Sequence, residues 1–98
     1  MKLLKLEKLN NSSKKYKATF QTDSGKTKST SFGASGMNDY TLTGDKEARK
    51  RYRKRHKKDL KTNDPTRAGY LSYYLLWGES TSIRENLKNY KNDLIFNK

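Results

Sequence analysis

Basic side chains are concentrated in one short segment of the chain. Residues 45–61 hold ten basic and three acidic residues, a net charge of +7, within a chain whose net charge is +13. Cations at this density, with few carboxylates to balance them, attract phosphate groups and release the counterions around a nucleic acid. The residues expected to contact phosphate are Arg49, Lys50, Arg53, Lys54, Lys57 and Lys58.

The same segment has two other interpretations. Blocks of charge are commonly solvated faces that bind nothing, and short runs of lysine and arginine also occur in nuclear-localisation segments, where chance matches are frequent. In a helix, however, the row Arg49, Arg53 and Lys57 would place like charges one turn apart, where they repel. A bound polyanion would relieve that repulsion, so we favour phosphate binding.

A second basic surface is expected near the N-terminal half of the chain. Lys15, Lys17 and Lys28 fall in segments that alternate polar and apolar residues, and would bring positive charge to a two-stranded ribbon. Such a ribbon can enter the major groove of DNA. The alternative is equally open, because lysine on an edge hairpin also discourages the addition of foreign strands.

Catalysis is not expected. His56 is the only histidine and the chain has no cysteine, so a Cys/His zinc site is impossible. Carboxylates such as Asp39, Asp45 and Asp64 could in principle hold Mg²⁺, but each is better explained as a turn or cap residue. We therefore expect a protein that is not an enzyme and that has no metal or other cofactor.

The N-terminal segments have the pattern of strands. Tyr16, Ala18 and Phe20 alternate with polar residues, which is typical of a half-buried strand. The turn residues of 22–25 separate this run from a second alternating run that ends near Gly33, and together they predict an antiparallel hairpin. Leu4 and Leu6 likewise alternate with Lys5 and Glu7, so strands are expected within residues 2–33.

Three helices are expected after the strands, at about 45–60, 65–77 and 82–94. The first has no Gly or Pro and carries a narrow, less polar stripe of Ala48, Tyr52 and His56. Asp64 followed by Pro65 predicts the start of the second. Strands followed by helices indicate an α+β domain, with a β-hairpin or three-stranded antiparallel sheet followed by two or three helices.

The second expected helix is apolar nearly all round, which is typical of a helix in the middle of a fold. Its aromatic residues could stack on unpaired bases, as in single-strand binders. Core packing is the favoured interpretation, because the 98-residue chain is only 31% hydrophobic and has few other apolar residues. That length fits one domain, residues 1–98. No apolar run approaches the roughly 18 residues that span a membrane, so no membrane association and an intracellular location are expected.

Three runs resemble a family of small, basic, functionally uncharacterised proteins of large nucleocytoplasmic DNA viruses. They are Ser31-Phe-Gly-Ala-Ser-Gly-Met-Asn-Asp-Tyr-Thr41, Arg51-Tyr-Arg-Lys-Arg-His-Lys-Lys58 and Asp64-Pro-Thr-Arg-Ala-Gly-Tyr-Leu-Ser-Tyr-Tyr-Leu-Leu-Trp77. The resemblance implies a viral origin, with the protein in the host nucleus or cytoplasm or packaged in the virion. It implies no catalytic residues.

The expected function is therefore non-enzymatic binding of nucleic acid, with DNA favoured over RNA, through the phosphate backbone. The alternative is a structural or minor capsid-type virion protein that binds acidic protein surfaces, in which case viral structural proteins are the partners. The two hypotheses are separated by whether binding survives nuclease treatment. The sequence does not predict an oligomeric state.

Overall fold

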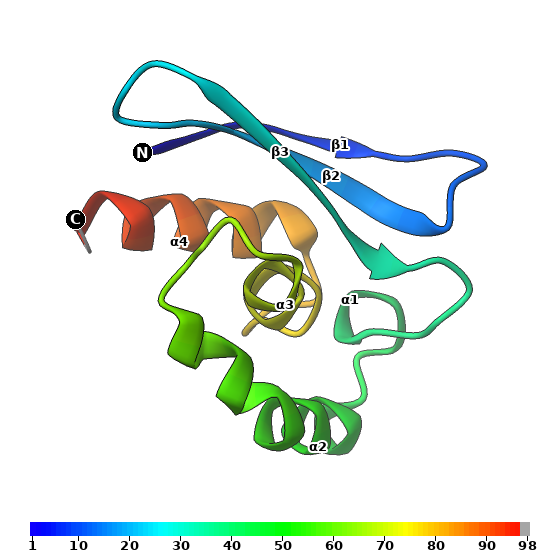
Figure 1. Cartoon of the computed structure of the whole chain (residues 1–98). Helices are drawn as coiled ribbons and strands as arrows, with labels where there is room; N and C mark the ends of the chain where they lie inside the picture. Colours follow the sequence, from blue (N-terminus) through cyan, green and yellow to red (C-terminus); the bar gives the residue numbers. More distant parts are fainter. Residues whose placement is uncertain (97–98) are drawn as a thin grey trace.

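An antiparallel sheet forms one face of the molecule (Figure 1). The computed structural model describes the backbone of residues 1–96 and the side chains of residues 1–92. Strands β1 (Lys2–Lys8), β2 (Lys14–Gln21) and β3 (Thr27–Ala34) lie in the order β1-β2-β3. The expected hairpin is confirmed as β2–β3, and residues 2–8 add the third strand.

Alternation along the hairpin places its apolar side chains on the face that meets the helices. Ala18, Phe20 and Phe32 are fully buried. Tyr16 pairs with Phe32 across the two strands, and their rings stack with centroids 5.9 Å apart. The turn between the strands uses Gly25 at a φ of 85°, which a residue with a side chain adopts at a cost.

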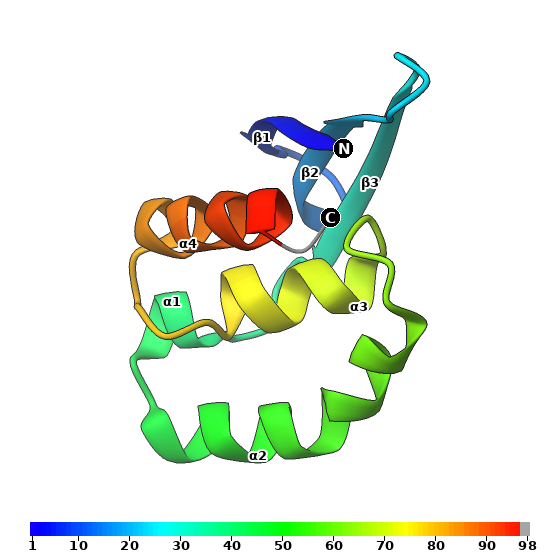
Figure 2. The same ribbon diagram turned by 90° about the vertical axis from the view of Figure 1, so that its left-hand side faces the viewer.

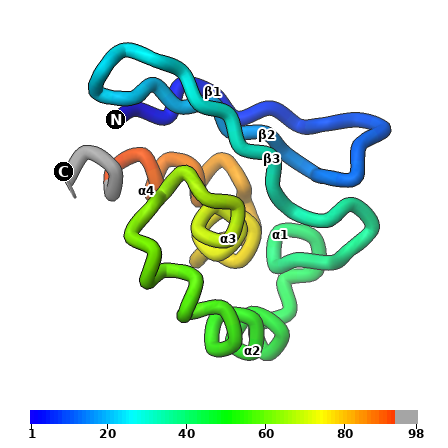
Figure 3. Tube along the Cα trace, viewed as in Figure 1, coloured from blue at the N-terminus to red at the C-terminus, as the bar shows by residue number. Residues whose placement is uncertain are grey.

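Four α-helices follow the sheet, so the predicted α+β class is confirmed. They are α1 (Tyr40–Thr43), α2 (Lys46–His56), α3 (Ala68–Leu71) and α4 (Ile83–Phe96). A 3₁₀ segment, η1 (Lys57–Thr62), continues α2, and a π-helical segment, η2 (Ser72–Leu76), continues α3. Figure 3 follows this path from the sheet through α1 to α2, and back through α3 to α4. The single turn of α1 was not expected.

The expected helix at 65–77 begins three residues late, at Ala68. The Asp64 carboxylate accepts hydrogen bonds from the backbone N–H of Thr66 at 3.0 Å and from its hydroxyl at 2.6 Å. The carbonyl of Pro65 accepts a hydrogen bond from the hydroxyl of Tyr90. These contacts hold residues 64–67 in a turn, and Arg67 has an extended backbone, so helical geometry starts only after it.

The helices form two further layers below the sheet (Figure 2). Segments α3 and η2 lie in the middle of the molecule, with α4 beside them under the sheet and α2 on the far side. Leu71, Leu75 and Leu76 are buried against the sheet core. This confirms the expectation that the apolar helix is central. The core combines these leucines with aromatic rings.

The connection from η2 to α4 is fixed by one buried amide. Asn86 donates to the carbonyls of Leu75, at 2.9 Å, and Ser80, at 2.8 Å, and accepts the Ser80 N–H at 3.0 Å. Gly78 packs against it so closely that a Cβ there would lie 2.2 Å from the Tyr74 carbonyl oxygen. Only glycine fits at this position, and the Gly78 carbonyl accepts a hydrogen bond from Arg49 of α2.

Candidate nucleic-acid interface

Helix α2 begins at a well-formed cap. The Asp45 carboxylate accepts hydrogen bonds from the backbone N–H groups of Glu47, at 3.0 Å, and Ala48, at 3.1 Å. The acidic cap and Glu47 suit the positive end of the helix dipole, while the cationic residues follow along the helix and in its last turn. The helix gives way to η1 at Lys57, and Asn63, at a φ of 52°, ends that segment.

Two arginines on the inward side attach α2 to the body of the protein. Arg53 donates to the carbonyls of Tyr73, at 3.2 Å, and Trp77, at 2.8 Å. Its guanidinium also lies 4.0 Å from the centroid of the Tyr73 ring, a cation–π contact. Arg49 donates through Nε to the Gly78 carbonyl at 2.7 Å. Both arginines thus bind carbonyls at or just beyond the carboxyl end of η2, where cations are favoured.

Aromatic stacking completes the attachment. Tyr52 lies between His56, with ring centroids 4.1 Å apart, and Trp77. His56 Nδ1 is 3.1 Å from a carboxylate oxygen of Asp59. Burial, followed by the nearby Asp59 charge, raises the pKa of the Tyr52 hydroxyl above its ordinary value. The predicted stripe of Ala48, Tyr52 and His56 therefore lies on the inward side, where His56 stacks on Tyr52.

The outward side of α2 and η1 is a surface of exposed cations, which we call the cationic face. None of its members forms an ion pair with any described side chain. Glu47 is the exposed acid among them. The cationic face consists of Lys46, Lys50, Arg51, Lys54, Arg55, Lys57, Lys58 and Lys61.

A shallow hollow marks the carboxyl end of the cationic face. It has a volume of about 610 Å³ and is lined by Lys57, Lys58, Leu60, Lys61 and Asn63. Three lysines and a half-buried leucine line this hollow, which is open to solvent. The arrangement suits a phosphate group at the carboxyl end of the cationic face.

Arg49 and Arg53 do not lie on the open surface with the other predicted contacts, and their contact with phosphate stays a prediction. Both are partly buried and engaged with backbone carbonyls. Burial, the largest cause, lowers the pKa of Arg53, although an arginine remains charged. The other four predicted residues of the segment, Lys50, Lys54, Lys57 and Lys58, are exposed together. The set of six expected contacts did not include Lys46, Arg51, Arg55 and Lys61, which are exposed as well.

The sheet lysines do not join this surface, because the sheet lies on the opposite side of the molecule from α2 (Figures 1 and 2). Lys15 donates to the buried Asp39 carboxylate at 2.6 Å and to the Met37 carbonyl. Lys28 is 4.0 Å from the Asp64 carboxylate. Lys17 is half-buried. The nine residues predicted from the sequence are thus not gathered on one surface, although Lys28 lines a hollow with Asp59 and Thr62 of η1.

Comparison with known proteins finds a family model and no characterised relative. A model described as a family of unknown function, DUF5754, matches residues 4–56. No curated protein matches the chain, and no solved structure matches it. The matched segment contains nearly all of the sheet and the whole of α2. The expected viral source stays a prediction, since these findings do not bear on it. Within residues 1–96, no helix combines the length and apolar character needed to cross a membrane.

Proposed function

We propose that this chain, which belongs to the DUF5754 family of unknown function, binds nucleic-acid phosphate through the cationic face of α2 and η1. The observation that supports the proposal is that the basic residues of α2 and η1 fall into two groups with different contacts. Arg49 and Arg53 are engaged with carbonyls, while the eight exposed cations have no acidic partner among the described side chains. Arg49, Arg53 and the Tyr52 stack attach α2, whereas the eight exposed cations of α2 and η1 make no contact of this kind with the described residues.

The binding is electrostatic and has little sequence preference. An α-helix of eleven residues is about 16 Å long, and duplex DNA carries one charge per ~1.7 Å of its axis. The helix therefore lies beside several phosphates at once. If six contacts form on duplex DNA, log K falls against log salt concentration with a slope of about −5. Affinity that is unchanged between low and moderate salt would contradict the proposal.

Charge reversal on two different helices tests the location of the interface. The variant Lys50→Glu/Lys54→Glu/Lys58→Glu reverses three members of the cationic face. The control Arg84→Glu/Lys88→Glu/Lys91→Glu makes the same change of net charge on exposed positions of α4. We expect the first variant to lose nearly all affinity for a labelled DNA duplex in a fluorescence anisotropy titration, and the control to retain most of it. Equal losses would mean that net charge alone, and not this face, accounts for binding.

Nuclease treatment separates this proposal from attachment to acidic proteins in a virus particle. Complexes isolated with the chain should dissociate when DNA and RNA are digested. Complexes that survive digestion, and that are lost in the α2 variant, would favour an acidic protein surface as the partner. Parallel titrations with DNA and RNA of the same length decide which nucleic acid is preferred.

A further inference from the structure

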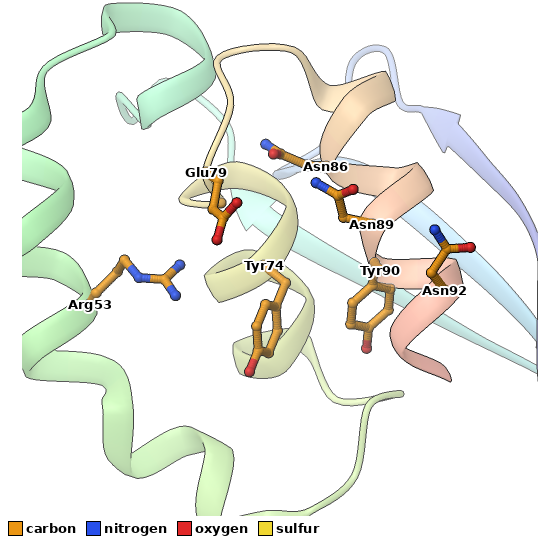
Figure 4. A pocket seen from close by; sticks show the side chains of 8 residues that line it. Arg53, Tyr74, Glu79, Asn86, Asn89, Tyr90 and Asn92 are labelled. Atoms are coloured by element: carbon orange, nitrogen blue, oxygen red, sulfur yellow. The ribbon is translucent and has the colours of Figure 1, made fainter. Parts of the chain in front are cut away.

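A polar cavity of about 410 Å³ opens between α2, η2 and α4 (Figure 4). Two aromatic residues of its lining, Tyr74 and Tyr90, have ring centroids 5.8 Å apart. The other walls carry Arg53 from α2, Glu79 from the loop after η2, and Asn89 from α4. The cavity lies next to the arginine that attaches α2 but on the body side of that helix.

The lining combines apolar faces with both kinds of hydrogen-bonding group. Glu79 and Asn89 are exposed, and their side chains make no hydrogen bond with the described residues. A carboxylate accepts, an amide both donates and accepts, and the guanidinium of Arg53 has more N–H groups than its two carbonyl partners use. A planar heterocycle with ring nitrogens and exocyclic amino or oxo groups matches this set. A phosphate does not, because Glu79 would repel it.

The cavity is adjacent to one row of the cationic face. Lys46, Lys50, Arg53 and Lys57 follow one another at spacings of four, three and four, and so form a row at the border between the cationic face and the inward side of α2. Arg53 is the member of this row that reaches into the cavity, as Figure 4 shows. A strand whose phosphates lie along the three lysines would therefore pass the mouth of the cavity.

We propose that this cavity takes one unpaired nucleobase of a strand whose phosphates lie along Lys50 and Lys57. This inference rests on the proposed function, and it adds a preference for single strands. Within a duplex the base is stacked and paired and would have to be flipped out of the helix, so duplex DNA fills the cavity poorly. Tyr74, whose half-buried ring also packs against Tyr70, Tyr73 and Tyr90, contacts the base, while Glu79 and Asn89 bond to its edge.

The test compares two oligonucleotides of equal length and phosphate charge, one with its bases and one composed of abasic residues. We expect the native chain to bind the base-bearing strand about tenfold more tightly, as stacking on an aromatic side chain provides. The variant Asn89→Leu should lose that preference while its affinity for the abasic strand is unchanged. Asn10→Leu, at an exposed loop position distant in sequence from the lining residues, is the matched control and should keep the preference.

The outcomes separate the two proposals. Tight, salt-dependent binding with no difference between the strands would overturn the base cavity and leave the phosphate interface standing. Retention of the preference in Asn89→Leu would also overturn it. No binding to either strand would overturn both. The variant Glu79→Leu, at an exposed loop position, blocks the cavity from a wall outside α4 and so tests whether the effect of Asn89→Leu is peculiar to α4. Circular dichroism checks that each variant is folded.

Discussion

The ring of Tyr52 is nearly parallel to the indole of Trp77, with 8° between the planes and 4.4 Å between the centroids. Because Tyr52 comes from α2 and Trp77 follows η2, this stack joins the cationic helix to the central layer. The adjoining contacts are hydrogen bonds and cation–π contacts of arginine, not aliphatic packing. The strongly cationic helix α2 is therefore attached by polar and aromatic groups, which can remain partly hydrated.

Replacing Tyr52 with leucine should weaken this attachment. The change removes stacking on both His56 and Trp77, each aromatic pair contributing roughly 1 kcal/mol beyond burial, so the free energy of unfolding should fall by about 2 kcal/mol. The chain's single tryptophan reports on the site directly, and its emission should shift in the folded state. An unchanged emission spectrum and melting temperature would show that the stack does not hold the helix.

Arginine and lysine should not be interchangeable at position 53. In Arg53→Lys the charge is kept, but the planar group that donates to two carbonyls and covers the Tyr73 ring is lost. We expect a loss of about 1.5 kcal/mol in urea denaturation. Arg55→Lys, on the exposed side, is the control and should leave stability unchanged. Equal stability of the two variants would contradict a structural role for Arg53.

Lys15 should matter for stability and not for phosphate binding. Its ammonium is 2.6 Å from the Asp39 carboxylate, whose side chain is only 2% exposed. Lys15→Gln leaves that buried charge without its cationic partner, which costs about 3 kcal/mol. Lys17→Gln, the control two positions along β2, removes the same charge from a side chain without an acidic partner among the described residues and should cost far less. The measurement is thermal unfolding together with DNA titration at the same salt concentration.

Acid should destabilise the fold partly through Asp64. Hydrogen bonds from Thr66 are the largest cause that holds the pKa of Asp64 below its ordinary value. A carboxyl whose pKa is depressed in the folded state stabilises it above the pKa of the unfolded chain, and this contribution is lost as the pH falls through the folded value. Thr66→Val removes the hydroxyl donor, so the decline in melting temperature below about pH 4 should be smaller than in the native chain. An identical decline would show that Thr66 does not set this pKa.

Local pattern was sufficient to predict the sheet and the central helix. Alternation at Tyr16, Ala18 and Phe20 indicated which face of the hairpin is buried, and that face is the one that meets the helices. The density of apolar residues after Ala68 indicated a buried helix. Both signals are properties of neighbouring residues, so neither needed knowledge of the tertiary structure.

The roles of the charged residues could not be predicted in the same way. Arg53 and Lys54 are neighbours of similar charge, yet the first binds carbonyls of residues 73 and 77 while the second is exposed. Nothing near position 53 in the sequence identifies those distant acceptors. The late start at Ala68 has a similar cause, because the Pro65 carbonyl is held by Tyr90 from the last helix. Each of these differences comes from a contact across more than fifteen positions.

The two inward guanidinium groups have a consequence for how α2 is rotated about its own axis. Lysine or arginine occurs on every side of this helix except the Ala48–Tyr52–His56 stripe, so charge by itself gives only a weak preference for one rotation over another. A planar guanidinium donates in fixed directions, which a spherical ammonium does not. Only one rotation of α2 brings both Arg49 and Arg53 to the carbonyls of residues 73, 77 and 78. The geometry of these two guanidinium groups thus determines which cations of α2 face the solvent.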